Sequence, residues 1–388
     1  MDAEEAARTA VRELTDEARP VFLGDRVLRR IRRRNRRASA GVAVILAALA
    51  ATVISWPSVA GRDVPSAVAP VDPSASAARA EPWRPFAGLT RLPSAGPRTD
   101  RLVVAAWAAS PGSPISILDP TTGRYRPFGV AAVLAVSPDL RFAIVTRQAP
   151  SGGVEFGVYD TAADVVLGRL DVDARLGRDE LSRAAWSPDG GSVALSVRRA
   201  VPELGWLAVQ LLVVDARTGA VAAADIRPRS GLEPVDMLGW TTDSQAVVFT
   251  ADRTGTDEVP SGHIVYDVSG AGVAAHQWAQ PSNAVPVVGT DELALVPIDG
   301  EQITVIGVRD GSPRRHYPTH TVNAVRGWDS PMAWRGDEMV LWPDRAVIRG
   351  VSAVTGGSRV LSSVPQSSQT VVVAPAPEPA GPVAALTL

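Results

Sequence analysis

A unit made of a tight polar turn followed by an apolar strand recurs after about residue 100, and it constrains the fold more than any other feature. Its three strongest copies are AVSPDLRFAIVTR at 135–147, AWSPDGGSVALSVRR at 185–199 and GWTTDSQAVVFTADR at 239–253. Each copy places a Ser/Thr-Pro/Thr-Asp turn before a strand in which apolar residues alternate. Similarity at a regular spacing indicates a repeat architecture, in which each unit buries its apolar face against its neighbours.

Three weaker copies, at 99–110, 289–300 and 334–345, extend the series to six. Within each unit a second polar turn, such as LDPTTGR at 118–124, separates two further strands. Four strands in about 45–50 residues are typical of one β-propeller blade. The sequence therefore predicts an all-β propeller of about six four-stranded blades over residues 100–375. The turn aspartates, which are 39, 50, 54, 48 and 46 residues apart, are Asp100, Asp139, Asp189, Asp243, Asp291 and Asp337.

A ring of blades closes when strands from both ends of the chain complete one blade. The strand QTVVVAP at 369–375 is the candidate for this closing strand, which leaves 376–388 as a C-terminal tail. An array of β-sandwich domains is the alternative, since short strands also recur in that fold. The regular spacing of the aspartates favours the propeller.

The Trp-Ser-Pro-Asp-Gly run at 186–190, followed by GSVALSV, resembles the repeat of TolB-type, WD-like bacterial propellers. The stretch 238–270 is similar to a full repeat of that kind. The resemblance covers about residues 100–365, and only the unit at 185–219 carries the motif nearly whole. It implies a propeller scaffold that hosts many different functions.

The N-terminal part sorts its charges into blocks. Residues 19–37 carry nine arginines and one acid, whereas residues 38–56 carry no charge. Nineteen residues span about 28 Å as a helix, which is close to the thickness of the hydrocarbon core of a membrane. Because basic residues mark the cytoplasmic side, the sequence predicts a transmembrane helix at 38–56. Residues 1–37 then lie in the cytoplasm and the propeller lies outside the cell membrane. The residues that flank this span are Arg34, Arg36, Arg37 and Trp56.

A cleaved signal peptide and a nucleic-acid-binding patch are the alternatives for this region. A charged leader of 37 residues is long for a signal peptide. No aromatic residues alternate with the arginines to stack on bases, so no nucleic-acid partner is predicted. The stretch 57–99, rich in Pro, Ala and Ser, is predicted to be an extended linker.

The cytoplasmic segment contains two predicted helices. Residues 3–18 form the first, with Leu14 on its apolar stripe, and the second carries Val27, Leu28 and Ile31. Two helices as short as these cannot bury a hydrophobic core of their own. These four residues are therefore candidates for contact with a cytoplasmic partner.

The stretch RELTDEARPVFLGDRVLRRIRRR at 12–34, placed before a single span, resembles the N-termini of actinobacterial membrane proteins that look like anti-sigma regulators. The resemblance implies a sigma factor, or a similar regulator, as the partner. The alternative is a basic helix that lies on anionic lipid.

The sequence carries no recognisable catalytic motif, and it contains no cysteine. We therefore predict no enzymatic activity, no cofactor and no metal site. The repeat aspartates are interpreted as turn residues, and most of the ten tryptophans as packing residues between blades. Trp206 and Trp278 are the exceptions, as candidates for exposed partner contacts.

These observations favour a membrane-anchored binding or sensing protein. Its extracytoplasmic ligand is predicted to be a protein or a glycan. Two alternatives remain open: a propeller hydrolase or lyase that acts on cell-envelope material, and a structural scaffold of the envelope.

Overall fold

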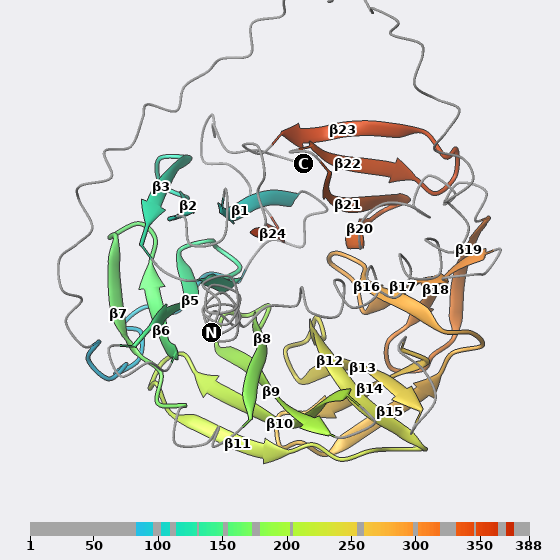
Figure 1. The fold of residues 1–388 in the computed structure, drawn as a ribbon, viewed down its shortest axis with the longest axis horizontal. Coiled ribbons are helices and arrows are strands. Elements are labelled where there is room, and N and C mark those ends of the chain that lie inside the picture. The colour runs from blue at the N-terminus through green and yellow to red at the C-terminus, as the bar shows by residue number, and fades with distance from the viewer. Residues whose placement is uncertain are drawn as a thin grey trace, which may run out of the picture. The chain divides into compact units, whose positions relative to one another are not determined.

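Six antiparallel sheets of four strands each are arranged in a ring in the computed structural model (Figure 1). The structure describes residues 83–95, 102–108, 114–129, 132–149, 154–172, 179–201, 205–253, 260–297, 302–318, 331–344, 347–363 and 370–375. The prediction of a six-bladed propeller with four-stranded blades is confirmed. No helix in these ranges is long and apolar enough to cross a membrane. The predicted span at 38–56 and the cytoplasmic helices lie outside the described residues.

Each blade runs from an innermost strand to an outermost strand. From the inside outwards, blades 1 to 3 are β24 (Thr370–Pro375), β1 (Leu102–Ala108), β2 (Ile115–Asp119) and β3 (Arg124–Phe128); β4 (Ala132–Val136), β5 (Phe142–Gln148), β6 (Val154–Asp160) and β7 (Val165–Arg169); and β8 (Glu180–Trp186), β9 (Ser192–Val201), β10 (Gly205–Asp215) and β11 (Val221–Asp225). In the same order, blades 4 to 6 are β12 (Leu232–Trp240), β13 (Ala246–Arg253), β14 (Gly262–Asp267) and β15 (Gly272–Gln277); β16 (Ser282–Pro286), β17 (Glu292–Pro297), β18 (Gln302–Gly307) and β19 (Pro313–Pro318); and β20 (Pro331–Arg335), β21 (Glu338–Asp344), β22 (Val347–Ser352) and β23 (Ser358–Ser363).

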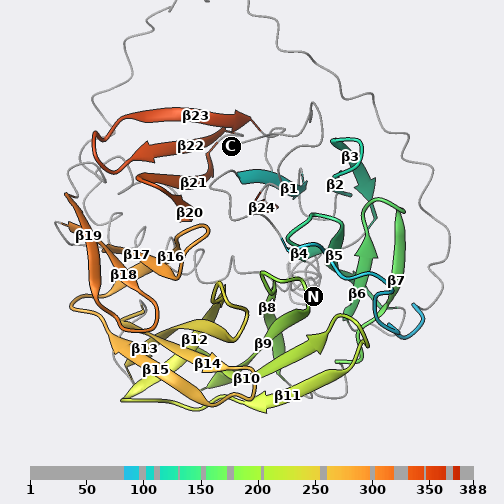
Figure 2. The ribbon, with the colours of Figure 1, turned by 180° about the vertical axis from the view of Figure 1, so that it is seen from behind.

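Blade 1 is the place where the ring closes. Its innermost strand, β24, comes from the C-terminal end of the described chain and pairs antiparallel with β1, with Leu102 opposite Pro375 and Ala108 opposite Thr370. In the other five blades the four strands follow one another in sequence (Figure 2). The closing strand predicted at 369–375 is therefore confirmed.

The repeat aspartates accept hydrogen bonds within their own turns, as the sequence predicts. At the turn between β8 and β9, the Ser187 hydroxyl donates to Asp189 Oδ1 at 2.6 Å and the Gly191 amide donates to the same oxygen at 2.9 Å. The Ser192 amide donates to Ser187 Oγ at 2.9 Å. Although burial opposes ionisation, the hydrogen bonds hold the pKa of Asp189 below its usual value. The same bonds recur around Asp139 and Asp243.

The second kind of turn, between the third and fourth strands of a blade, lies beside the first kind. The Thr161 amide donates to Arg141 O, and the Ala216 amide donates to Gly191 O. Both kinds of turn therefore occupy one face of the ring, which we name the Asp-turn face. Successive turns also join blades, since the Asp189 amide donates to Ser244 Oγ at 3.1 Å.

Apolar residues fill the seams between neighbouring blades. Trp186 and Trp334 are buried there, as predicted for blade-packing tryptophans. Trp278 is also buried, with 6% of its surface exposed, so its prediction as an exposed partner contact is wrong. The reason is a hydrogen bond from its indole Nε1 to His263 Nδ1. Trp206 is half-buried, and the Arg198 guanidinium lies 4.5 Å from the centre of its ring.

Residues 83–95 fall within the stretch predicted as linker, 57–99, yet they pack against blades 2 and 3. Phe86 and Leu89 are buried, with 8% and 5% of their surfaces exposed. The composition of the linker as a whole is too polar and too rich in Pro to form a core. These two apolar side chains instead enter a seam that the blades provide. We name residues 83–95 the strap.

His263 connects blade 4 to blade 5. Its Nδ1 accepts from Trp278 at 3.0 Å, so Nε2 carries the proton and donates to Val308 O at 2.7 Å. The side chain is fully buried. Burial, with a smaller contribution from the charge of neighbouring His276, lowers the pKa of His263 to about 4. The imidazole is therefore neutral in the folded protein at neutral pH.

We expect the protein to lose stability on mild acidification because of His263. An unfolded histidine has a pKa of about 6.5, so below that pH the unfolded state binds the proton and the folded state does not. The free energy of unfolding should fall by about 2 kcal/mol from this group between pH 7 and pH 5. Urea unfolding of wild type and His263→Phe at several pH values measures the effect.

The His263→Phe variant should be less stable at pH 7, since Val308 O and the Trp278 indole lose their partner, but its stability should change less with pH. His316→Phe on β19 is the matched control and should keep the wild-type dependence. An equal loss of stability in wild type and His263→Phe between pH 7 and pH 5 would contradict the assignment of the acid sensitivity to His263.

Candidate functional site

None of the predicted cytoplasmic partner contacts or membrane-flanking residues lies in the part of the chain that the structure describes. They therefore stay predictions. The candidate cytoplasmic partner contacts and the membrane-flanking residues are Leu14, Val27, Leu28, Ile31, Arg34, Arg36, Arg37 and Trp56.

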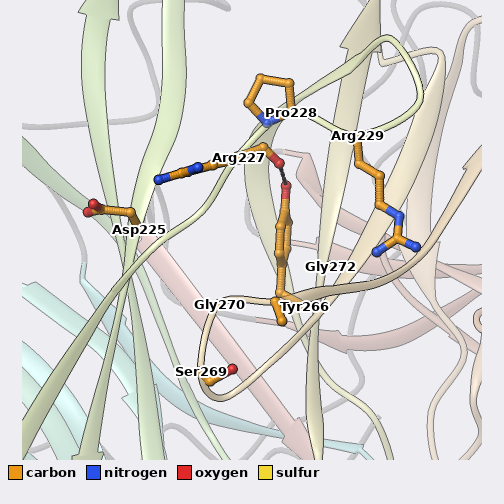
Figure 3. Close-up of a pocket in the computed structure, with 9 residues that line it drawn as sticks. Asp225, Arg227, Pro228, Arg229, Tyr266, Ser269, Gly270 and Gly272 are labelled. Atoms are coloured by element: carbon orange, nitrogen blue, oxygen red, sulfur yellow. Dashed lines mark hydrogen bonds between the residues drawn. The ribbon is translucent and has the colours of Figure 1, made fainter.

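A groove of about 480 Å³ opens at the rim of the ring between blades 3 and 4 (Figure 3). One wall is the segment that follows β11, and the other is the turn between β14 and β15. We name it the rim groove. Its lining residues are Asp225, Arg227, Pro228, Arg229, Tyr266, Ser269, Gly270, Ala271 and Gly272.

The first wall is shaped by a tight hairpin. The Arg229 amide donates to Leu232 O at 3.0 Å, and the Leu232 amide donates back to Arg229 O at 2.9 Å. Ser230 and Gly231 between them have φ values of 54° and 73°. Two successive residues with positive φ are typical of a type I′ turn, which Ser-Gly accommodates because glycine has no Cβ. This turn holds Arg229 at the edge of the groove.

The second wall is a turn organised by a carboxylate. Asp267 Oδ1 accepts from the Ser269 hydroxyl at 2.6 Å and from the amides of Ser269 and Ala271. Gly270 at its tip has φ of +81°, and a Cβ there would lie 2.8 Å from Ala224 Cβ. A glycine is therefore required for blade 4 to approach blade 3 this closely.

Tyr266 joins the two walls. Its ring is buried, and its hydroxyl donates to Arg227 O at 2.6 Å. Burial, and then the negative charge of Glu233, raise the pKa of Tyr266 above its usual value, so the hydroxyl keeps its proton. Figure 3 shows the tyrosine ring between the two arginines, whose side chains point away from each other.

Arg227 and Arg229 supply the positive charge of the rim groove, and Asp225 is the acid that lines the groove with them. Both arginines are exposed, and neither guanidinium forms a hydrogen bond or an ion pair within the described ranges. Arg199 nearby is different, because it binds Asp179 through two hydrogen bonds of 2.8 and 2.7 Å. Asp225, at the end of the groove, accepts from the Gln210 amide group at 3.2 Å.

The chemistry available in the rim groove is that of binding. Exposed guanidinium groups bind carboxylates and phosphates through charge-assisted hydrogen bonds. No group of three or more His, Asp or Glu residues in the described part of the chain is arranged to hold a metal ion. The sequence signal for this groove is only the triplet Arg227-Pro228-Arg229. In a chain whose 39 basic residues are all arginine, such a triplet does not stand out.

Comparison with known proteins gives no family for this chain. No protein-family model matches it, and no curated protein matches it significantly. Among solved structures, TolB from Acinetobacter baumannii aligns with 74% of this chain and 69% of its own, at 15% identity and a TM-score of 0.45.

Two further structural matches have similar scores. The nidogen/laminin complex aligns over 71% of this chain and 99% of the matched chain, at 9% identity and a TM-score of 0.44. Dipeptidyl peptidase 4 from Porphyromonas gingivalis aligns over 70% of this chain and 45% of its own, at 11% identity and a TM-score of 0.40. The order of the paired strands, independently of these matches, establishes the propeller.

Proposed function

We propose that the protein is a non-catalytic binding protein whose rim groove takes an acidic segment of a partner protein. The observation that carries this proposal is the pair of exposed arginines, Arg227 and Arg229, without an acidic partner among the described residues at an open groove. Arginine is enriched among the residues that dominate protein–protein binding energy. An open groove at the rim also suits a surface contact better than an enclosed small molecule.

The divergence of the two arginines defines the ligand further. Their side chains lie on opposite sides of Tyr266 (Figure 3), so a single small anion contacts only one of them. An extended segment with two acidic side chains reaches both. Because the Tyr266 hydroxyl and the hairpin hold the backbone at Arg227 and Arg229, little ordering of the main chain accompanies binding.

We expect Arg227→Ser and Arg229→Ser each to weaken the binding of a fluorescent poly-glutamate peptide by about tenfold, because each loses charge-assisted hydrogen bonds. The double variant should also show a weaker dependence on salt. Fluorescence anisotropy at several salt concentrations measures both effects. Arg124→Ser, an exposed arginine on β3, is the matched control and should bind as wild type.

Failure of the wild-type protein to bind the peptide would overturn this part of the proposal. An equal weakening in Arg124→Ser would do the same, because it would show that net charge alone attracts the probe.

We further propose that residues 38–56 anchor the protein in the cell membrane, with the propeller outside, and that residues 1–37 bind a sigma factor or similar regulator. The support is the block of arginines before an uncharged run of nineteen residues. The apolar stripes of the two predicted helices provide the contact surface. Ligand binding at the propeller is then sensed across one membrane span.

We expect full-length protein, extracted from membranes, to retain a sigma factor that the Leu14→Ser, Val27→Ser, Leu28→Ser, Ile31→Ser variant does not retain. Removal of the apolar stripes should abolish the contact without moving the protein out of the membrane fraction. Affinity capture followed by mass spectrometry measures this. A control with Arg34, Arg36 and Arg37 changed to Ser separates capture by charge from capture by the stripes.

Equal capture by wild type and the four-serine variant would contradict the signalling role. Recovery of the wild-type protein outside the membrane fraction would contradict the anchor.

A further inference from the structure

The strap, residues 83–95, is bound to the propeller through its main chain. The Arg169 amide at the end of β7 donates to Arg84 O at 2.6 Å, and the Phe86 amide donates to Arg169 O at 2.8 Å. This pairing is parallel and extends blade 2 at its outer edge. Farther along, the Leu89 amide donates to Ala216 O of blade 3 at 2.8 Å. The strap therefore crosses the seam between blades 2 and 3.

The far end of the strap reaches the Asp-turn face. The Ser94 amide donates to Asp139 Oδ2 at 3.0 Å, in the turn between β4 and β5. At the near end, the ring of Trp83 lies 4.1 Å from the guanidinium carbon of Arg147. Arg147 in turn binds Glu155 at 2.7 Å. Both ends of the strap are thus held by polar groups of blade 2.

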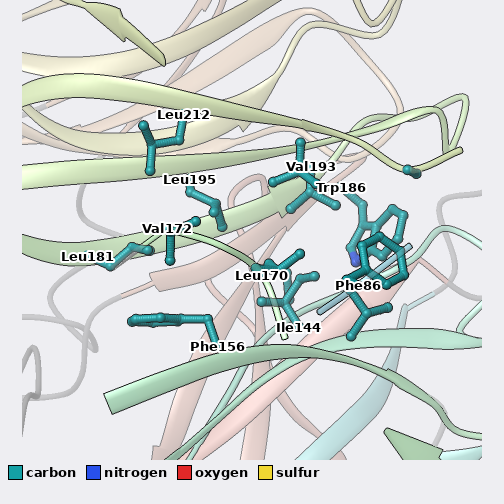
Figure 4. Close-up of a cluster of buried hydrophobic side chains, with 14 of the residues drawn as sticks. Phe86, Ile144, Phe156, Leu170, Val172, Leu181, Trp186, Val193, Leu195 and Leu212 are labelled. Carbon is teal, nitrogen blue, oxygen red and sulfur yellow. The ribbon is translucent and has the colours of Figure 1, made fainter. Parts of the chain in front are cut away.

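Between these ends, the strap inserts apolar side chains into the seam. Phe86 and Leu89 belong to the same buried cluster as Leu170 and Trp186 (Figure 4). The intervening strap residues, such as Ala87 and those at 90–91, are exposed. The buried strap residues, Phe86, Leu89 and Pro93, are three and four residues apart with exposed residues between them, so one side of the strap faces the blades, as in a peptide bound in a groove.

Glycines in both blades make room for the strap. A Cβ on Gly168 would lie 2.5 Å from Phe86 Cα, and a Cβ on Gly219 would lie 2.5 Å from Phe86 O. A Cβ on Gly190 would lie 2.7 Å from Pro93 Cβ. The strap contributes Gly88, which has φ of +91° and whose Cβ would lie 1.9 Å from Arg217 O. Backbone approaches this close are possible only with glycine.

We propose that the groove between blades 2 and 3 is a peptide-docking site and that the strap is its resident ligand. The N-terminal part of the chain is then held on the propeller by docking, in addition to the covalent link through residues 96–101. A cut within 96–101 leaves the two parts attached. Docking of the strap is independent of the proposed function, because it rests only on contacts within the described residues.

The test uses the full chain with the site of a sequence-specific protease inserted between Gly96 and Asp100. The protein is folded, cleaved and passed over a size-exclusion column without denaturant. We expect the N-terminal fragment to elute with the propeller, in a complex with the mass of one chain. Elution of the two fragments apart would overturn the proposal, and so would a complex with the mass of two chains.

A variant pair identifies the contacts that hold the fragment. In Phe86→Ser/Leu89→Ser the loss of two buried apolar side chains should raise the dissociation constant of the nicked complex at least about 100-fold. Thr90→Ser/Arg91→Ser changes exposed strap residues and should leave the dissociation constant of the nicked complex unchanged. Equal retention of the fragment in both variants would overturn the proposal.

A competition experiment on the nicked wild-type protein keeps the test valid if the strap variant fails to fold. A synthetic peptide of residues 80–97 in excess should displace the labelled N-terminal fragment. The same peptide with Phe86→Ser and Leu89→Ser should not. Absence of displacement by the wild-type peptide, or equal displacement by both peptides, would overturn the proposal.

Discussion

The pairing of β24 with β1 is the interaction on which the rest of the structure depends. Each blade buries its apolar residues against two neighbours, so a ring is stable only when its first and last blades meet. The antiparallel register from Leu102 opposite Pro375 to Ala108 opposite Thr370 provides this closure. Without it, β1 would expose an unpaired inner edge. Closure thus joins distant parts of the chain, whereas the other five blades form from strands close in sequence.

The strap and the rim groove both use seams of the closed ring, and blade 3 takes part in both. The strap crosses the seam with blade 2, where Gly168 and Gly219 admit its backbone. The rim groove lies at the seam with blade 4, where Gly270 admits a close approach of the turn between β14 and β15 to strand β11. In both places the blades form the fixed framework of the ring. A glycine at the seam then allows a close approach of the backbone, and the strap groove or the rim groove forms there. The framework itself is held by Ser/Thr and Asp turns on one face.

The features that can be predicted from the sequence are those with local causes. A Ser or Thr two residues before Asp forms its own hydrogen bonds, so the spacing of the turn aspartates reveals the blades. Docking of Phe86 depends on Gly168 and Gly219, which are far away in sequence, and therefore leaves no local pattern. The prediction for Trp278 is wrong for a different reason, because its partner, the buried His263, lies on β14 of the same blade and its burial is set by the contact with blade 5. The rim groove escapes prediction because it forms only where the turn between β14 and β15 meets the segment that follows β11, and the sequence near Arg227 and Arg229 carries no sign of that contact.

Hydrogen–deuterium exchange of β1, combined with urea unfolding, tests the central claim of ring closure most directly. The comparison is between chains that end at residue 369 and at residue 375, since only the second keeps β24. If closure stabilises the ring, the shorter chain loses protection of the β1 amides and loses its cooperative transition, while the longer one behaves as the full chain does. Equal protection of β1 and equal unfolding midpoints in the two truncated chains would contradict the claim.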